Sequence, residues 1–374
     1  MIRLVARGYT ALFTYAFTTS FTDGRRVFAA IGLLLALPPF LAWQLLHWLG
    51  FLLDEVFFRG YRNVEVREPL FVLGPPRSGT THLHRVLALD ESTTTFSTWE
   101  CLFGLSVTGR RLLLALAKVD RVLGRPLTRL ASWLGRKTLS SMDEIHELRM
   151  DAPEEDFLCL MPAAACFLLI VPFPYLEHLW RVAHFDVAVD EKDKRALMRY
   201  YRRCIQKHLY VFGEGKRYLA KNPSFSGMAE SLLEAFPDAR IIACTRDPVA
   251  TIPSQLSSLR PGLAACGFRE FPADLRDRLI ATLYFYYEHL REAAAQEPSR
   301  MTFIGNDELK NDLQNAIETA FEHIGIEVSS AFAERLGQAA VESREFLSGH
   351  RYSLDEYGLD EAELRERFAG VMPG

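Results

Sequence analysis

The fold of this chain is decided by the stretch Leu70-Phe71-Val72-Leu73-Gly74-Pro75-Pro76-Arg77-Ser78-Gly79-Thr80-Thr81. Its first four residues are apolar and predict a short buried strand, and a helix is expected over Thr80–Leu89. Gly74 and Gly79 let the backbone curl so that successive N–H groups point inward, and the start of a helix adds partial positive charge. The stretch therefore predicts a cradle for an anion, built at a turn from strand to helix.

The spacing of the two glycines is that of a nucleotide-binding P-loop, but Thr80 stands where a phosphoryl-transfer loop has lysine. That lysine binds the β- and γ-phosphates in ATPases and kinases. Arg77, inside the loop, is the cation that replaces it. A degenerate P-loop kinase or nucleotide hydrolase is thus a weaker alternative for this chain.

Beyond the loop, short β-like runs alternate with longer helical ones. Further strands are expected at Tyr218–Ala220, Arg240–Thr245 and Met301–Ile304, with helices near Val249–Leu259 and Ala273–Ala293. This alternation predicts an α/β fold, a P-loop-like parallel sheet flanked by helices. The segment from Arg110 to about His208 reads as a largely helical insertion that supplies a lid or an acceptor pocket.

A second cluster of phosphate-binding residue types follows the strand candidate Arg240–Thr245. Arg246 stands at the strand end, and Ser254 comes eight residues later, two turns into the next helix. Both side chains are therefore expected to reach one phosphate.

Together the two clusters resemble the superfamily of sulfotransferases that use 3′-phosphoadenosine-5′-phosphosulfate (PAPS), in the bacterial-type branch that is also similar to tyrosylprotein sulfotransferases. The resemblance covers roughly Leu70 to Phe368. It implies that Arg246 and Ser254 bind the 3′-phosphate and that PAPS is the co-substrate, released as 3′,5′-ADP (PAP). It also implies that the 5′-phosphosulfate is held by the loop residues Pro76, Arg77, Ser78, Gly79, Thr80 and Thr81.

Three further features belong to this resemblance. Lys221, in Lys221-Asn222-Pro223, matches a lysine that assists the leaving group, a role that Arg77 shares. Arg351 and Tyr352 lie in a segment that closes over the nucleotide in relatives. Where relatives have Ser-Pro-x-His, this chain has Asn222-Pro223-Ser224-Phe225, so the contacts to the acceptor are not carried over.

Sulfuryl transfer requires a base that takes the acceptor proton. Glu100 stands where tyrosylprotein-type relatives have a catalytic glutamate, and His146 is the rival because a histidine serves in cytosolic relatives. The acidic run Glu154-Glu155-Asp156 is interpreted as a helix N-terminal cap with a solvated face. No metal is expected.

The N-terminal segment is the most apolar part of the chain. Val27–Leu53 contains no Asp, Glu, Lys or Arg, and exceeds the roughly 20 residues that span a bilayer. A spanning helix, a monotopic insertion bent at Pro38-Pro39, and helices packed on the catalytic domain or on a partner subunit all remain open. We expect residues 1–66 to form this membrane-associated or packing segment and residues 67–374 to form the catalytic domain.

Composition limits the partners. The formal net charge is −4, which gives no reason to propose nucleic acid, and the six scattered cysteines are typical of reduced thiols. The apolar segments favour a lipid or another hydrophobic alcohol as acceptor. Because PAPS is made in the cytoplasm, we expect the N-terminal segment to hold the protein in the cytoplasm, at the inner face of a membrane. A homo-oligomer and a membrane-associated nucleotide-binding protein without turnover are the remaining alternatives.

Overall fold

A five-stranded parallel sheet forms the centre of the computed structural model, which describes residues 1–22, 27–126, 129, 150–213, 215–345 and 353–372. The strands lie in the order β2-β3-β1-β4-β5. Their bounds are β1 Leu70–Leu73, β2 Thr93–Thr94, β3 Arg217–Lys221, β4 Arg240–Thr245 and β5 Met301–Gly305. The predicted α/β class and parallel sheet are confirmed.

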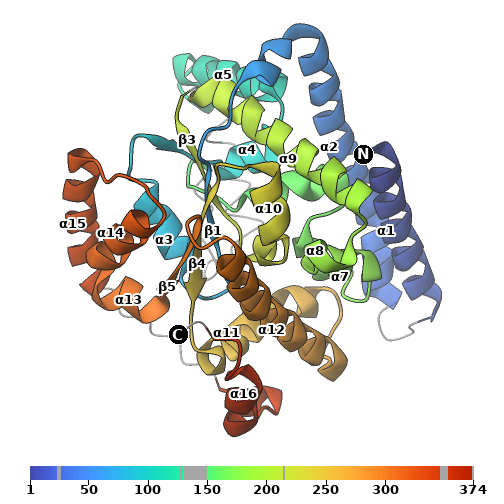
Figure 1. Cartoon of the computed structure of the whole chain (residues 1–374). Coiled ribbons are helices and arrows are strands. Elements are labelled where there is room, and N and C mark those ends of the chain that lie inside the picture. The colour runs from blue at the N-terminus through green and yellow to red at the C-terminus, as the bar shows by residue number, and fades with distance from the viewer. Residues whose placement is uncertain (23–26, 127–128, 130–149, 214, 346–352, 373–374) are drawn as a thin grey trace.

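Strands β1 and β4 are buried on both faces, as their apolar runs predict. Leu70 and Val72 of β1 face one layer of helices, whereas Phe71 and Leu73 face the other. Helices α3, α13, α14 and α15 cover the first face, and α9, α10 and α12 cover the second (Figure 1).

The order of the strands also fixes where a ligand can bind. From β1 the chain moves to one side of the sheet, to β2 and β3, and it then returns to place β4 on the other side of β1. The connections after β1 and β4 therefore diverge and leave a crevice at the carboxyl ends of these strands, where open α/β sheets bind their ligands.

Helices account for most of the remaining described chain, including the described part of the expected helical insertion. Their bounds are α1 Ile2–Thr22, α2 Val27–Phe57, η1 Arg59–Asn63, α3 Thr80–Leu87, α4 Thr98–Phe103, α5 Val107–Val122, η2 Asp156–Ala163, η3 Phe167–Ile170, α7 Glu177–Ala183, α8 Phe185–Ala188, α9 Glu191–Phe212, η4 Pro223–Met228, α10 Ala229–Ala235, α11 Pro248–Ala265, α12 Ala273–Gln296, α13 Asn306–Asn311, α14 Leu313–His323, α15 Ser330–Glu345, η5 Asp355–Tyr357 and α16 Glu361–Phe368.

The N-terminal helices α1 and α2 pack against each other and against the rest of the protein (Figure 1). The Tyr9 hydroxyl donates to the carbonyl of Met161 at 3.2 Å, and the Trp48 indole donates to the carbonyl of Pro162 at 3.1 Å. Leu12 is fully buried in the same core cluster as Phe71 of β1. The described part of the N-terminal segment thus shares its hydrophobic core with the sheet.

The expected break at Pro38-Pro39 is wrong, because α2 continues through both prolines to Phe57. The two prolines remove two N–H donors from the helix, but their fixed φ is compatible with helical geometry. By length and composition, Ala30–Phe57 is the one described helix that could cross a membrane, and only 22% of its most apolar stretch is buried.

Asp54 fixes the C-terminal end of α2 to the protein. Its carboxylate accepts the backbone N–H groups of Val107 and Thr108 at the start of α5, at 2.9 and 2.8 Å. Lys207 of α9 donates to the same carboxylate at 2.6 Å, and both charged side chains are almost completely buried. Removing one partner of a buried charge pair destabilises a protein by several kcal/mol. The interactions of Asp54 therefore hold α2, α5 and α9 together.

Candidate active site

The loop between β1 and α3 has the tight geometry that its glycines predict. Gly74 has φ +134°, and a Cβ there would lie 2.3 Å from the carbonyl oxygen of Cys244 in β4. Gly79 has φ +99° and is the N-cap of α3, with no side chain capping that helix. The first N–H groups of α3 consequently remain available for an anion.

A buried hydroxyl in this loop supports the anion cradle. Ser78 is completely buried, and its Oγ has no hydrogen-bond partner among the described residues. An unsatisfied buried hydroxyl is costly, and a phosphate oxygen would satisfy it. The hydroxyl and the uncapped start of α3 both fit a phosphate group.

The structure brings the second cluster against this loop. The guanidinium Nε of Arg77 donates to the hydroxyl of Ser254 at 3.0 Å, and Arg246 Nη1 donates to the carbonyl of Arg77 at 3.0 Å. Ser254 itself is fully buried in α11. Two arginines and two serines from segments almost 180 residues apart therefore lie at one end of the sheet.

Lys221 reaches the same region from the adjacent strand. It ends β3, which pairs with β1, and its ammonium donates to the hydroxyl of Thr81 at 3.1 Å. It also forms an ion pair with Glu155 at 2.5 Å. The lysine side chain is almost fully buried, whereas that of Glu155 keeps about a quarter of its surface exposed.

A hydrogen-bond network lies directly behind this ion pair. Asp156 follows Glu155 in the chain and Asn222 follows Lys221, and the Asn222 amide donates to Asp156 at 2.8 Å. Tyr201 and Tyr218 also donate their hydroxyls to Asp156. The residues next to the two ionic partners are therefore fixed to each other.

Burial raises the pKa of Asp156 from 3.8 to about 6, although the three hydrogen bonds act to lower it. Because the folded pKa is raised, the folded state binds more protons than the unfolded state between about pH 4 and pH 6. The stability that Asp156 contributes is thus fully present below about pH 4 and is lost as the pH rises through about 6.

We predict that Asp156→Asn, which cannot ionise, removes this dependence. The free energy of unfolding of the wild type relative to the variant should fall by about 3 kcal/mol between pH 4 and pH 7. Urea denaturation of both proteins at several pH values measures it. Glu191→Gln, at an exposed acid on α9, is the control. If the free energy of unfolding changes with pH in the same way for the wild type and for Asp156→Asn, the raised pKa of Asp156 is contradicted.

Glu100 occupies a different environment. Its Oε2 accepts the backbone N–H and the hydroxyl of Ser97 and completes a capping box for α4. Its Oε1 lies 2.9 Å from Nε of the fully buried Arg110 and 2.7 Å from the ring of His208. Burial acts to raise the pKa of Glu100, but His208 and Arg110 outweigh it and lower the pKa to about 2. The carboxylate is a weak base with both oxygens engaged.

Sequence reasoning did not identify Glu155 and Asp156. The interpretation of Glu154-Glu155-Asp156 as a solvated face is wrong for Asp156, which is 1% exposed, and Glu155 is paired with Lys221. The available signal was the position of these acids directly before a long apolar segment, where a charge needs a partner. His146, Arg351 and Tyr352 lie outside the described residues.

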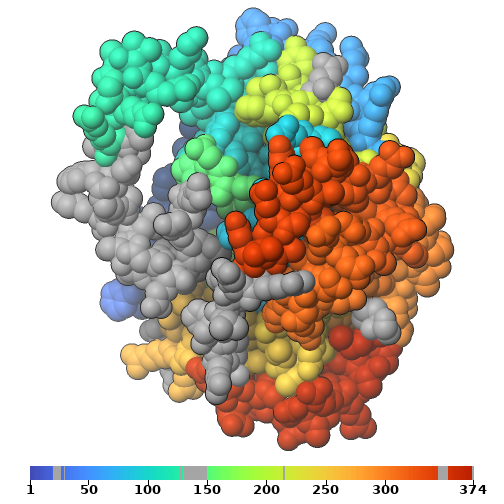
Figure 2. All heavy atoms as spheres, turned by 90° about the vertical axis from the view of Figure 1, so that its left-hand side faces the viewer, coloured from blue at the N-terminus to red at the C-terminus, as the bar shows by residue number. Residues whose placement is uncertain are grey.

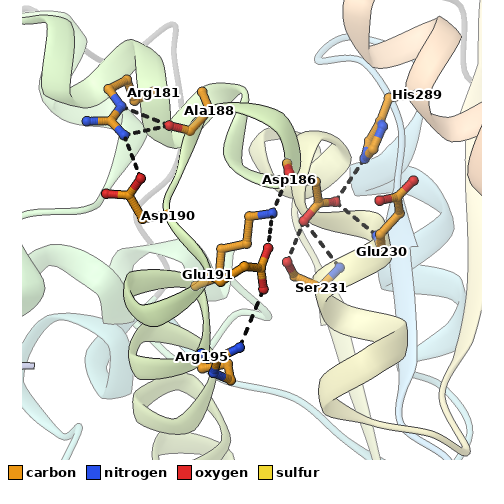
Figure 3. A network of polar contacts seen from close by, with 10 residues as sticks. Arg181, Asp186, Ala188, Asp190, Glu191, Arg195, Glu230, Ser231 and His289 are labelled. Carbon is orange, nitrogen blue, oxygen red and sulfur yellow. Dashed lines mark hydrogen bonds and ion pairs between the residues drawn. The ribbon is translucent and has the colours of Figure 1, made fainter.

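One group of residue types that could hold a metal occurs among the described residues. It consists of Asp186, Glu230 and His289 (Figure 3). The Asp186 carboxylate accepts the N–H groups of Glu230 and Ser231 at the start of α10, and it lies 2.8 Å from the His289 ring. Asp186 therefore anchors α10, and hydrogen bonds account for its orientation.

Comparisons with known proteins agree with this geometry. The model of a family described as the sulfotransferase family matches residues 69–330. The omega-hydroxy-beta-dihydromenaquinone-9 sulfotransferase Stf3 of Mycobacterium bovis is 26% identical, over 86% of this chain and 84% of its own length. The Mycobacterium tuberculosis protein of the same name aligns equally well.

Two solved structures share the fold. Sulfotransferase STF1 of Mycobacterium tuberculosis superposes with a TM-score of 0.71 and 18% identity, over 99% of this chain and 98% of its own. Sulfotransferase STF9 of Mycobacterium avium gives a TM-score of 0.67 and 20% identity, over 86% and 80% of the two chains.

Proposed function

Because the chain belongs to the sulfotransferase family, we propose that it transfers a sulfuryl group from PAPS to the hydroxyl of a hydrophobic, lipid-like acceptor. The observation that carries this proposal is the buried, unpartnered Ser78 hydroxyl in a loop that contacts Arg246 and, through Arg77, Ser254. Family membership removes the kinase alternative.

In this proposal the loop residues Pro76 to Thr81 hold the 5′-phosphosulfate, and Arg246 and Ser254 hold the 3′-phosphate. Arg77 lies between the two phosphate positions, because its side chain contacts Ser254 and its carbonyl accepts from Arg246. Arg351 and Tyr352 are proposed to cover the nucleotide.

We predict that Arg246→Ala weakens the binding of PAP by about 1.5–3 kcal/mol, the range for a hydrogen bond to a charged group. Adenosine 5′-phosphosulfate, which lacks the 3′-phosphate, should bind almost as it does to the wild type. Calorimetric titration of both ligands measures the effect. Arg365→Ala is the matched control, because this exposed arginine pairs with the neighbouring Asp247. Equal losses for both ligands would refute the assignment of the 3′-phosphate site.

The proposed chemistry needs cations near the leaving phosphate and a base near the acceptor hydroxyl. When bound, PAPS supplies an electrophilic sulfur and a phosphate leaving group. Lys221 and Arg77 are proposed to stabilise the charge on that phosphate. If Lys221 turns its ammonium toward the phosphate, Glu155 loses its present donor and can accept the proton of the acceptor hydroxyl.

Glu155 is the base that this geometry favours over Glu100. Glu155 contacts Lys221 and keeps an exposed edge, so an acceptor can reach it. Both oxygens of Glu100 are occupied by Ser97, Arg110 and His208, and its lowered pKa makes proton uptake unfavourable. His146 remains a third candidate.

We predict that Glu155→Gln lowers kcat by about 10²–10⁴-fold with little change in PAP affinity. Glu100→Gln should instead lower the free energy of unfolding by about 3 kcal/mol, because it leaves the buried Arg110 without its anion. Steady-state kinetics, PAP titration and urea denaturation of both variants and of His146→Ala separate these outcomes. If Glu100→Gln keeps the free energy of unfolding of the wild type but lowers kcat, and Glu155→Gln has a kcat close to that of the wild type, then Glu100 is the base.

The acceptor is proposed to be a hydrophobic alcohol. The relative Stf3 is named for an omega-hydroxylated menaquinone, and the segment that follows Glu155 and Asp156 is apolar from Phe157 to Pro174. Because PAPS is made in the cytoplasm, we propose that the enzyme works there, next to a membrane.

We predict that a lipid extract incubated with the enzyme and labelled PAPS yields a labelled sulfate ester in the lipid fraction. Mass spectrometry of the products identifies it, and Glu155→Gln is the control for turnover. Label that enters only water-soluble products would contradict the proposed class of acceptor. No labelled product with any acceptor would favour a nucleotide-binding protein without turnover.

A further inference from the structure

Helix α5 carries an apolar stripe that faces solvent. Leu112, Leu116, Val119 and Leu123 are separated by four, three and four residues, so they lie on one side of the helix. Each is between 45% and 69% exposed. Figure 2 shows the C-terminal half of α5 standing away from the body of the protein.

Helix α2 has a stripe with the same spacing. Leu45, Leu49, Leu52 and Val56 are between 51% and 65% exposed, and the helix has no charged residue before Asp54. Single exposed leucines are ordinary on a soluble protein, but repeated stripes on neighbouring helices indicate a surface that binds something.

The two helices contact each other directly. Asp54, near the end of α2, accepts the first N–H groups of α5, and Arg111 of α5 lies over the ring of Phe58. The stripes therefore keep a fixed relation to each other and to the sheet.

The exposed charges around the α5 stripe are basic. Arg111, Lys118, Arg121 and Arg125 are exposed, whereas Asp120, the acid of this helix, is 4% exposed. Glu55, the partly exposed acid of α2, is paired with Arg62. An apolar stripe bordered by lysine and arginine is the pattern of helices that lie on an anionic lipid surface.

From these observations we infer that α2 and α5 form a bilayer-docking face, defined by the two stripes and their basic border, which binds an anionic leaflet without spanning it. A spanning position for α2 conflicts with its packing along the protein, through Trp48 and Asp54. A second copy of the chain is a poorer occupant, because a twofold contact would bring the basic border of α5 against itself. Anionic headgroups neutralise that border.

This inference deepens the proposed function, on which its biological meaning rests, because a docked enzyme would meet a lipid-like acceptor in the membrane. Docking itself requires neither PAPS nor turnover. Vesicle binding and PAP binding can therefore fail independently.

The test is sedimentation of the full chain with vesicles of phosphatidylcholine alone or with added phosphatidylglycerol. The wild type should bind the anionic vesicles, and high salt should weaken the binding. Two double variants, Leu116→Glu with Val119→Glu on α5 and Leu49→Glu with Leu52→Glu on α2, should each lower the partition coefficient by at least about tenfold. Lys118→Glu with Arg121→Glu should remove the preference for anionic vesicles.

Val341→Glu is the matched control, because Val341 is a 62% exposed apolar residue on α15, away from both stripes. It should bind vesicles as the wild type does. All variants should retain their thermal midpoint and their affinity for PAP, which separates loss of docking from loss of the fold or of the nucleotide site. Absence of vesicle binding by the wild type, or equal binding by all variants, would overturn the inference. A concentration-dependent dimer that the α5 or α2 variants abolish would assign the face to a second copy instead.

Discussion

The ammonium of Lys221 joins three parts of the chain that are far apart in sequence, and the candidate site depends on it. It donates to Thr81 at the start of α3 and to Glu155 ahead of η2, while its own backbone belongs to β3. A lysine this deeply buried needs an anion. In the present structure Glu155 is that anion, and a bound phosphate would compete for the same ammonium. In the proposed function, donor binding and release of the Glu155 carboxylate would thereby be coupled through one side chain.

The surrounding buried acids divide into two kinds. Asp156 accepts neutral hydroxyl and amide donors, so burial dominates and its pKa is raised to about 6. Glu100 is next to His208 and Arg110, and these two partners outweigh burial and lower its pKa to about 2. Neither acid has a free edge toward an acceptor, since both are nearly inaccessible. Asp156 fixes the residues next to Glu155 and Lys221, whereas Glu100 joins α4 to α5 and α9 through Arg110 and His208.

The sequence predicts the parts of the site that depend on local patterns. The glycines at Gly74 and Gly79 act on neighbouring backbone, and Arg246 follows its strand directly, so their positions can be read without the fold. The pairing of Glu155 with Lys221 spans 66 residues and is not visible locally. Glu100, predicted as the base, shows the opposite case, because Ser97-Thr98-Trp99-Glu100 is the pattern of a capping box, a local signal from which its structural role could have been predicted. The continuation of α2 through Pro38-Pro39 depends on packing, which propensity does not include.

The N-terminal helices also bear on the site through η2. Tyr9 and Trp48 donate to the carbonyls of Met161 and Pro162, in the short helix that begins at Asp156. The carbonyl of Met161 also accepts the N–H of Ala164, whereas the carbonyl of Pro162 would lose both of its side-chain donors without Tyr9 and Trp48. Leaving one buried carbonyl unsatisfied costs about 1–3 kcal/mol. Helix η2, which begins at Asp156 directly after Glu155, is thus held in place by α1 and α2. The same α2 presents its apolar stripe outward, so one helix both supports the segment next to the proposed base and contributes to the surface inferred to contact lipid.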